Sequence, residues 1–305
     1  MASARTNRIR IIAGALLIGL IAGGFGAWWF LFRDDSAVSV ESSEAAAARQ
    51  EAIDAAVAGA QGGEGDDDGD PDEASVDGAG GGEGDEERDD GRDADSADAV
   101  SGQADSAAVV GSAADGVWVV DTSIGTFGEE CLEVVCSAGF VGFRIDEELA
   151  GIGAKTVVGR TPAVDGRMEI QGTQILSAEI VADMTQLLTD NPSRTGALKT
   201  ANGGLETATF PEASFVLAEP IELGQIPVEG AAVQVDALGD LTVRGVTQRV
   251  TIPLTAELQA GLVVVFGTLE DMALADYGIP KPQAVVVLSV EEVAAMELQL
   301  FFGRR

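Results

Sequence analysis

The chain contains two cysteines, Cys131 and Cys136, and no histidine, which limits the chemistry that its side chains can perform. Without histidine, neither a Ser-His-Asp triad nor a Cys-His pair can form, and no metal can be held by imidazole. The C-x4-C spacing is unusual for a redox or metal site, and two thiolates alone hold a metal poorly. Outside the cytoplasm a disulfide is expected, and closing this short loop contributes about 2 kcal/mol. We therefore expect no metal site and no bound cofactor.

Carboxylates are the remaining groups of the domain that could act as an acid or a base. Glu147, Glu148 and Asp183 lie next to predicted strands, but nothing in the sequence places two of them at a catalytic spacing. Composition alone also leaves Ser-Lys chemistry open. Because no set of residues indicates catalysis, we expect a binding protein rather than an enzyme.

Charge is distributed unevenly along the 305 residues, whose formal net charge is −33. Residues 1–33 contain arginines and no acid, residues 34–115 carry a net charge of −22, and residues 116–305 carry −15. A nucleic-acid partner requires a cationic footprint, and none is present beyond the N-terminus. The composition therefore argues against nucleic-acid binding.

Residues 11–32, IIAGALLIGLIAGGFGAWWFLF, contain no charged side chain. As a helix they span about 33 Å, enough to cross the hydrocarbon core of a membrane. Arginines precede this segment, so residues 1–10 are expected as a basic cytoplasmic N-terminus and the rest of the chain outside. A cleaved signal peptide is the alternative, although its apolar core is usually shorter and no A-x-A-like site follows Trp28. We expect a single-pass anchor in the cell membrane.

Residues 33–115 are rich in Asp, Glu, Gly, Ala and Ser and contain no aromatic residue, so they cannot bury a core. Within them, residues 43–61 favour a marginal helix with Ser43 as its cap. The segment is predicted to be an acidic, disordered linker. A flexible tether of this length has a root-mean-square span of about 50 Å, which would hold the following domain away from the membrane.

Residues 116–305 are long enough for one domain, and apolar residues alternate with polar ones in many short segments. Residues 183–200 are the main helical candidate after the linker, as two short turns interrupted by Asn191-Pro192. Many one-sided strands predict an antiparallel sandwich or a closed barrel. The predicted strands are 117–122, 139–145, 174–184, 213–223, 233–243, 246–258, 262–269, 284–290 and 296–302.

A β-hairpin with a two-residue turn at Arg244-Gly245 is the most specific local prediction. The apolar positions change phase once, at this turn, so a tight turn places Val243 opposite Val246. On the other face the same register places Asp240 opposite Arg249, a favourable cross-strand pair. The hairpin is therefore predicted to have one apolar face and one polar face.

Five segments of residues 117–305 together resemble the YceI-like domains, a polyisoprenoid-binding family. The resemblance implies an eight-stranded antiparallel, lipocalin-like barrel with one or two short helices. It also implies a lumen that holds a long isoprenoid chain, such as a quinone tail or a polyprenyl lipid. The segments, in the family's order, are SAGFVGFRIDEELAGIGAKTVVGRTPAVDGRMEI, VADMTQLLTDNPSRTGALKT, ATFPEASFVLAEPIEL, GDLTVRGVTQRVTIPL and ADYGIPKP.

The sequence departs from the family's pattern at two positions. Arg244 stands where the family commonly has the histidine of L-T-x-H-G-V-T, and Arg194, in RTGAL, lacks the aspartate of R-D-x-x-L. Residues 128–136, GEECLEVVC, look like an insertion before the second strand. A head-group contact made by that histidine or aspartate in the family would therefore be missing here.

Apolar strand faces predict the lining of the lumen, although alternation alone does not distinguish a ligand-holding lumen from a packed core. Trp118 is expected to close the floor of the barrel. The basic residues near predicted rims or turns, and the single tyrosine, either contact a head group or serve only at the surface; they are Arg144, Arg160, Arg194, Lys199, Arg244 and Tyr277. The predicted lining residues are Val141, Phe143, Leu176, Ile180, Met184, Phe215, Leu217, Val235, Val243, Ile252, Leu254, Val265, Leu298 and Leu300.

These observations favour a membrane-tethered, extracytoplasmic binding protein that holds an isoprenoid lipid of the quinone or polyprenyl type for transport, storage or sensing. Its partners would be that lipid and the cell membrane. One alternative is a ligand-free β-domain that acts as a cell-envelope interaction or stress-related module. The other is an enzyme that uses the barrel mouth. The sequence defines neither the lipid nor the oligomeric state.

Overall fold

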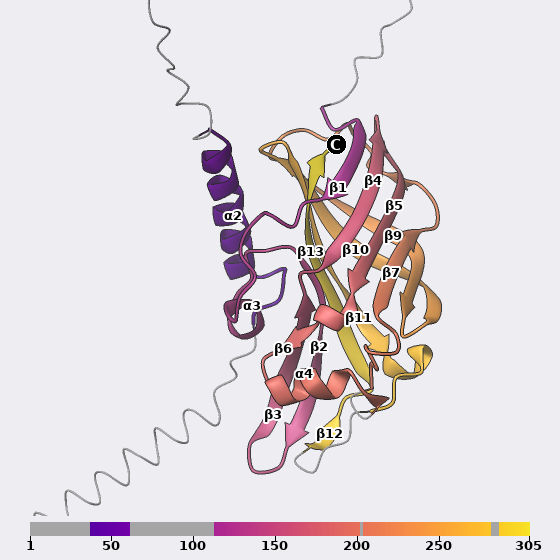
Figure 1. Cartoon of the computed structure of the whole chain (residues 1–305). Helices are drawn as coiled ribbons and strands as arrows, with labels where there is room; N and C mark the ends of the chain where they lie inside the picture. The colour runs from indigo at the N-terminus through magenta and orange to yellow at the C-terminus, as the bar shows by residue number, and fades with distance from the viewer. Residues whose placement is uncertain (1–36, 62–112, 202–203, 282–286) are drawn as a thin grey trace, which may run out of the picture.

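The computed structural model describes residues 37–61, 113–201, 204–281 and 287–305, and the anchor predicted at residues 11–32 lies outside these ranges. Among the described residues, no helix is both long enough and apolar enough to cross a membrane. A β-barrel makes up most of this part of the chain, and one long helix lies along its outer wall (Figure 1).

Eight antiparallel strands form a closed ring in the described part of the chain, because the last strand pairs back to the first. This confirms the predicted eight-stranded antiparallel barrel. In the order of the ring the strands are β1 (Gly116–Val120), β4 (Val164–Gln171), β5 (Gln174–Asp183), β7 (Glu212–Leu217), β9 (Ala232–Val243), β10 (Val246–Gln259), β11 (Leu262–Ala273) and β13 (Val293–Arg304).

Additional strands extend the wall, and all of them except β8, which pairs with the start of β5, lie at one end of the barrel. Strand β13 pairs with β1 near its C-terminus and with β2 near its N-terminus, so β2 continues the wall where β1 stops. Strand β3 pairs with β2, and β6 pairs with β3. The additional strands are β2 (Phe140–Leu149), β3 (Gly153–Thr161), β6 (Leu188–Thr189), β8 (Ile221–Glu222) and β12 (Val287–Val290).

The predicted helical segment, residues 183–200, contains the 3-10 turn η1 (Met184–Gln186) and the helix α4 (Pro192–Leu198). The Asn191 side chain accepts hydrogen bonds from the first free N–H groups of α4, and Pro192 occupies a position that needs no N–H donor. The prediction of two short turns interrupted at Asn191-Pro192 is therefore confirmed.

The hairpin of β9 and β10 has the predicted register, with Val243 opposite Val246 and Asp240 opposite Arg249. Arg244 and Gly245 have φ angles of 51° and 72°, as a type I′ turn requires. The guanidinium of Arg249 donates to the Asp240 carboxylate at 2.6 Å on the solvent face. Turn chemistry and hydrophobic phase thus agree on this register.

The predicted disulfide between Cys131 and Cys136 is present. It lies in the loop between β1 and β2, which contains the short helix α3 (Glu130–Glu133). Both cysteines are buried against Val40 and Phe140, so the insertion packs on the outer wall of the barrel.

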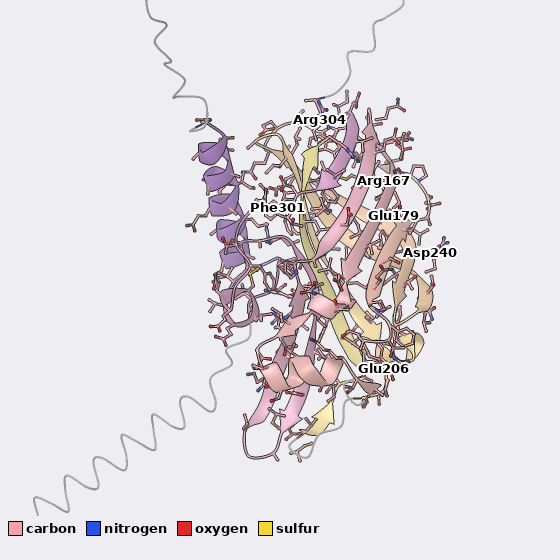
Figure 2. All side chains as sticks on the ribbon, viewed as in Figure 1. Arg167, Glu179, Glu206, Asp240, Phe301 and Arg304 are labelled. Carbon is pink, nitrogen blue, oxygen red and sulfur yellow. A yellow bond between two sulfur atoms is a disulfide. The ribbon has the colours of Figure 1, made fainter. Side chains whose placement is uncertain are left out.

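Helix α2 (Ser43–Gln61) packs on the barrel, so the prediction of one disordered linker over residues 33–115 is wrong for residues 37–61. The buried positions of α2 recur at helical spacing, and Ile53 contacts a cluster that includes Val264 and Phe301. Phe301 faces α2 in Figure 2. The helix is capped by Ser42, whose hydroxyl accepts the N–H of Ala45 at 3.1 Å, rather than by Ser43.

Arginine side chains fasten the segment before α2 to the barrel. Arg160 of β3, which is 1% exposed, donates to the Val38 carbonyl, and Arg144 of β2 donates to the Ala37 carbonyl. Arg49 of α2 donates to the Val40 carbonyl at 2.6 Å and lies 3.7 Å from the centroid of the Phe266 ring. The folded domain therefore includes residues 37–61, which the sequence analysis assigned to the linker.

Ile53→Ala is expected to lower the free energy of unfolding by about 2–4 kcal/mol, because it leaves a cavity between α2 and the barrel. Urea unfolding followed by circular dichroism measures this loss. Glu51→Ala, at an exposed position of the same helix, should change the free energy of unfolding by less than about 0.5 kcal/mol. Equal, small effects of both substitutions would contradict the packing of α2 on the barrel.

Candidate functional site

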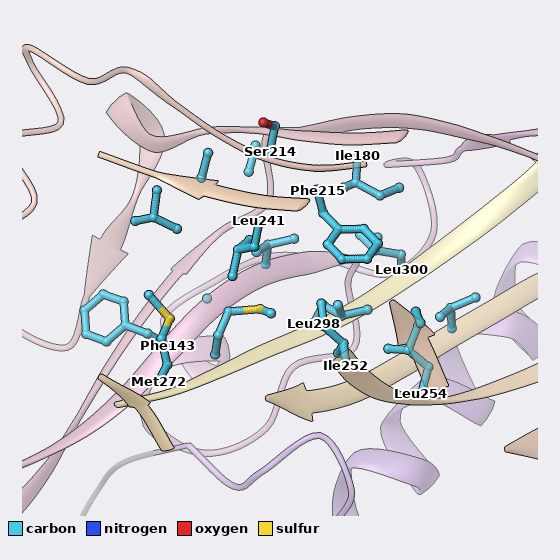
Figure 3. A pocket seen from close by; sticks show the side chains of 18 of the residues that line it. Phe143, Ile180, Ser214, Phe215, Leu241, Ile252, Leu254, Met272, Leu298 and Leu300 are labelled. Carbon is cyan, nitrogen blue, oxygen red and sulfur yellow. The ribbon is translucent and has the colours of Figure 1, made fainter. Parts of the chain in front are cut away.

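The interior of the barrel contains a cavity of about 190 Å³ (Figure 3). It is partly open and is lined by the inward faces of strands from around the ring. Among the described residues that line it, Ser214 alone has a side chain with a hydroxyl, and none is charged. Such a cavity stabilises hydrocarbon and offers few hydrogen bonds.

Thirteen of the fourteen predicted lining residues line this cavity. The strand period identified them because successive side chains of a strand point alternately to the inner and the outer face of the barrel wall. They are Val141, Phe143, Ile180, Met184, Phe215, Leu217, Val235, Val243, Ile252, Leu254, Val265, Leu298 and Leu300.

Leu176 is the exception, and the prediction that it lines the lumen is wrong. The pairing of β4 with β5 shifts by one residue between Glu169 and Ile170, so Ser177 pairs with Glu169 whereas Ile175 pairs with Ile170. This bulge removes Leu176 from the alternation and places Ile175 in the lining. Sequence alternation carries no signal for such an insertion.

One end of the cavity is closed by buried side chains, and we call it the Trp118 end. Trp118 is 2% exposed and packs in a cluster with Met168 and Phe302. Its indole N–H donates to the Ala114 carbonyl at 2.8 Å, which satisfies the polar atom of the ring. Trp118 thus lies where the sequence predicted a closed floor.

Residues outside the eight strands of the ring contribute to the lining at the opposite end, and we call it the α4 end. Leu198 of α4, Leu205, Leu274 of the 3-10 turn η3 (Leu274–Tyr277) and Ile279 contribute to the lining there. Several residues that line the cavity, including Val243, Ile252 and Met296, form one cluster with Leu205, Leu274 and Ile279. The α4 end is therefore made of short elements rather than of continuous sheet.

Two glycines make room for aromatic rings of the lining. A Cβ atom on Gly239 of β9 would lie 2.2 Å from the Phe215 ring, and one on Gly159 of β3 would lie 2.4 Å from the Phe143 ring. Larger residues at these positions would push the rings away from the wall. These glycines therefore help to keep the cavity open, a role that no pattern in the sequence indicates.

Arg194 and Arg244, two of the predicted head-group candidates, are engaged with the protein. Arg194 forms ion pairs with Glu147 and Asp190. Arg244 donates to the Gly278 carbonyl at 2.6 Å and to the Glu206 carboxylate at 3.0 Å. Both arginines lie near the α4 end, but their ion pairs occupy much of their donor capacity.

Tyr277, the third candidate, is 2% exposed and packs in the cluster at the α4 end. Its hydroxyl has no hydrogen-bond partner among the described residues. Burial, and secondarily the charge of Asp276, raises the pKa of Tyr277, so the hydroxyl stays protonated. A buried, unpaired hydroxyl is a candidate donor for a ligand, although Tyr277, like Arg194 and Arg244, is not one of the residues that line the cavity.

The other basic candidates have structural positions. Arg144 and Arg160 lie on the outer wall, where they bind the segment before α2, and Lys199 follows the last residue of α4. Arg160 also forms a buried ion pair with Glu297, which is 0% exposed. None of these three contributes to the lining of the cavity.

The acidic candidates do not form a catalytic pair. Glu147 pairs with Arg194, and the Asp183 carboxylate accepts the N–H and hydroxyl of Thr185 at the start of η1. In the described part of the chain, no group of three or more His, Cys, Asp or Glu residues is placed to hold a metal ion.

The model of the YceI-like domain family matches residues 132–301. No curated protein sequence matches the chain. Among solved structures, the chain is similar to BcnA of Burkholderia cenocepacia, with 14% identity, a TM-score of 0.40, and coverage of 53% of this chain and 95% of that one.

A polyisoprenoid binding domain from Saccharophagus degradans, implicated in plant cell wall breakdown, has 17% identity and a TM-score of 0.45, with coverage of 62% of this chain and 98% of that one. The YceI protein of Campylobacter jejuni has 12% identity and a TM-score of 0.35, with coverage of 45% and 83%.

Proposed function

Because the chain belongs to the family of YceI-like domains, we propose that it holds an isoprenoid lipid, of the quinone or polyprenyl type, inside its barrel. The observation that carries this proposal is the lining of the cavity, which among the described residues is apolar apart from the Ser214 hydroxyl. We further propose that residues 11–32 anchor the protein in the cell membrane and that the barrel lies outside the cytoplasm.

Hydrocarbon burial supplies enough free energy for this function. An eight-stranded barrel is just wide enough to hold one slender ligand. Each buried methylene group contributes about 0.8 kcal/mol, so about a dozen contribute about 10 kcal/mol before the costs of association are subtracted. This binding needs neither a catalytic residue nor a metal, so we propose a carrier, store or sensor rather than an enzyme.

Tyr277 is the residue that we propose as the head-group contact, because its hydroxyl is buried and unpaired at the α4 end. A quinone carbonyl is an acceptor for this hydroxyl. Arg244, whose buried Nε has no hydrogen-bond partner among the described residues, is proposed as a further donor at this end.

Tyr277→Phe is expected to weaken the binding of a prenyl quinone about tenfold, because one hydrogen bond contributes about 1–1.5 kcal/mol. The free energy of unfolding of the ligand-free protein should not fall, because the substitution removes an unsatisfied buried hydroxyl. Titration with the quinone, and with a prenyl hydrocarbon that lacks a head group, measures the difference. Equal losses for both ligands would contradict the contact.

A transfer assay tests the proposed function. The chain from residue 37 is mixed with vesicles that contain a prenyl quinone, the vesicles are removed, and quinone is measured by its absorbance in the protein fraction. We expect about one quinone per barrel, the limit set by the width of an eight-stranded ring. A protein fraction without quinone, and without a polyprenyl lipid in a parallel assay, would overturn the proposal and favour a ligand-free interaction module.

A further inference from the structure

The position at which the chain joins the barrel determines how far the barrel can lie from the proposed anchor. Ala37 is 0% exposed, its N–H donates to the Leu132 carbonyl at 3.2 Å, and its carbonyl accepts from Arg144. Four residues separate Ala37 from Phe32, the last residue of the apolar segment. Fully extended, this connection spans at most about 18 Å.

This short connection replaces the long tether that the sequence predicted. The remaining acidic residues do not lie between the anchor and the barrel, because α2 is already packed on the wall when they begin. They instead connect Gln61 of α2 to Ala113 before β1. The barrel therefore lies close to the bilayer if residues 11–32 are inserted in it.

The same contacts determine which end of the barrel faces the bilayer. Arg144, which holds Ala37, lies between Phe143 and Ile145 on β2, and both of these neighbours line the cavity. From Ala37 onward the chain runs toward the Trp118 end, because Ile53 of α2 packs with Phe301 and Leu262, which lie near the C-terminal end of β13. The anchor therefore approaches from the side of the α4 end.

At the Trp118 end, the chain enters the barrel again after the acidic segment. The Arg304 guanidinium donates to the Ala113 carbonyl at 2.7 Å, and Gln259, in the turn region between β10 and β11, donates to Gln50 of α2. Both boundaries of the acidic segment are thus at the Trp118 end. If the Trp118 end lies away from the bilayer, the carboxylates of the acidic segment are also separated from anionic lipid head groups.

The surface of the α4 end suits contact with lipid head groups and upper acyl chains. Leu288 of β12 is 62% exposed and Leu188 of β6 is 43% exposed. Two ion pairs, Lys281 with Glu292 and Lys155 with Asp190, also lie at this end. Exposed apolar residues such as Ile226 also occur at the Trp118 end, so the chain connection, rather than apolarity, selects the face.

We propose that the barrel docks on the bilayer with its α4 end, so that a lipid passes directly from the membrane into the cavity. This inference rests on the membrane anchor and lipid binding of the proposed function. We take the α4 end as the route for a ligand, because short elements such as α4 and η3 contribute to the lining there, whereas Trp118 packs at the opposite end. The docking partner is the lipid surface itself rather than another protein.

Depth-dependent quenching tests the orientation in the full chain reconstituted in vesicles. Both native cysteines are in the disulfide, so Leu288→Cys and Ile226→Cys each provide a single thiol for a fluorescent label. Lipids with a quencher near the head group should cause a strong loss of fluorescence at position 288 and none at position 226. Quenching at neither position, at both equally, or only at position 226 would overturn the proposal.

A pair of insertions tests whether the short connection between the anchor and the barrel sets this orientation. A 20-residue Gly/Ser segment after Asp35 adds about 25 Å of root-mean-square reach and should abolish most of the quenching at position 288. The same insertion after Asp89, within the acidic segment, is the matched control and should leave the quenching unchanged. Unchanged quenching after the insertion at Asp35 would contradict an orientation set by the short connection.

These outcomes are distinguishable from failure of the proposed function. Quenching does not require a lipid in the cavity, and quinone uptake by the chain from residue 37 does not require an anchor. A full chain that does not float with the vesicles would refute the anchor, and with it the docking. Quinone uptake without quenching at position 288 would leave lipid binding intact and refute only the docking.

Discussion

Leu254→Glu is expected to abolish lipid binding by the barrel. Leu254 of β10 lines the cavity, and no lining residue is available to pair with a carboxylate there (Figure 3). Burying the charge against hydrocarbon costs several kcal/mol, so the dissociation constant should rise at least about a hundredfold. The quinone-transfer assay measures the loss.

Thr251→Glu is the matched control, because Thr251 lies on the same strand with its side chain exposed on the outer face. This variant should bind lipid as the wild type does. Should Leu254→Glu prevent folding, Ala178→Phe fills the cavity without introducing a charge and should also abolish binding. Wild-type uptake by a folded Leu254→Glu or Ala178→Phe variant would show that the lipid does not bind inside the barrel.

Arg160→Ala is expected to lower the free energy of unfolding by about 3–5 kcal/mol, because it leaves the buried carboxylate of Glu297 without its partner. Arg160 and Glu297 are 1% and 0% exposed, and the guanidinium donates to Glu297 at 2.8 Å. The substitution also removes the donors to the carbonyls of Cys131 and Val38. Urea unfolding at neutral pH measures the change.

Arg249→Ala provides the comparison, since Arg249 pairs with Asp240 across the hairpin with side chains that are 55% and 43% exposed. An exposed pair of this kind contributes about 0–1 kcal/mol. A loss for Arg160→Ala as small as that for Arg249→Ala would contradict the role of the buried pair in fastening residues 37–61 to the barrel.

The hairpin and the lining show what the sequence could predict. Strict alternation and one turn signal determined the register of β9 and β10, and the same period identified all but one of the expected lining residues. Leu176 failed because a bulge changes the phase without changing the composition. Local rules worked for these strands, in which one face is buried and the other is wet, but β4 (Val164–Gln171) has the same alternation and was absent from the predicted strands.

Strand β3 shows where those rules fail. Its residues from Val157 to Thr161 are all buried, because the cavity side is covered by the barrel and the outer side by the loop of α3 and the segment near Val38. A strand buried on both faces has no alternation, so residues 153–161 were absent from the predicted strands. The covering segment itself was predicted to be disordered linker.

The head-group candidates were chosen by residue type, and type alone does not reveal partners. Arg194 and Arg244 are held by Glu147 and Glu206, which lie 47 and 38 residues away in the chain. Only the fold brings these acids to the arginines. Tyr277 remains a candidate because the fold buries its hydroxyl without a partner.

Native mass spectrometry of residues 37–305, exported and purified without detergent, tests the central claim most directly. We predict an additional mass of several hundred daltons that is extracted by organic solvent and absent from Leu254→Glu. The mass of the bare polypeptide, both as purified and after incubation with prenyl quinones and polyprenyl lipids, would contradict the claim that the barrel holds an isoprenoid lipid.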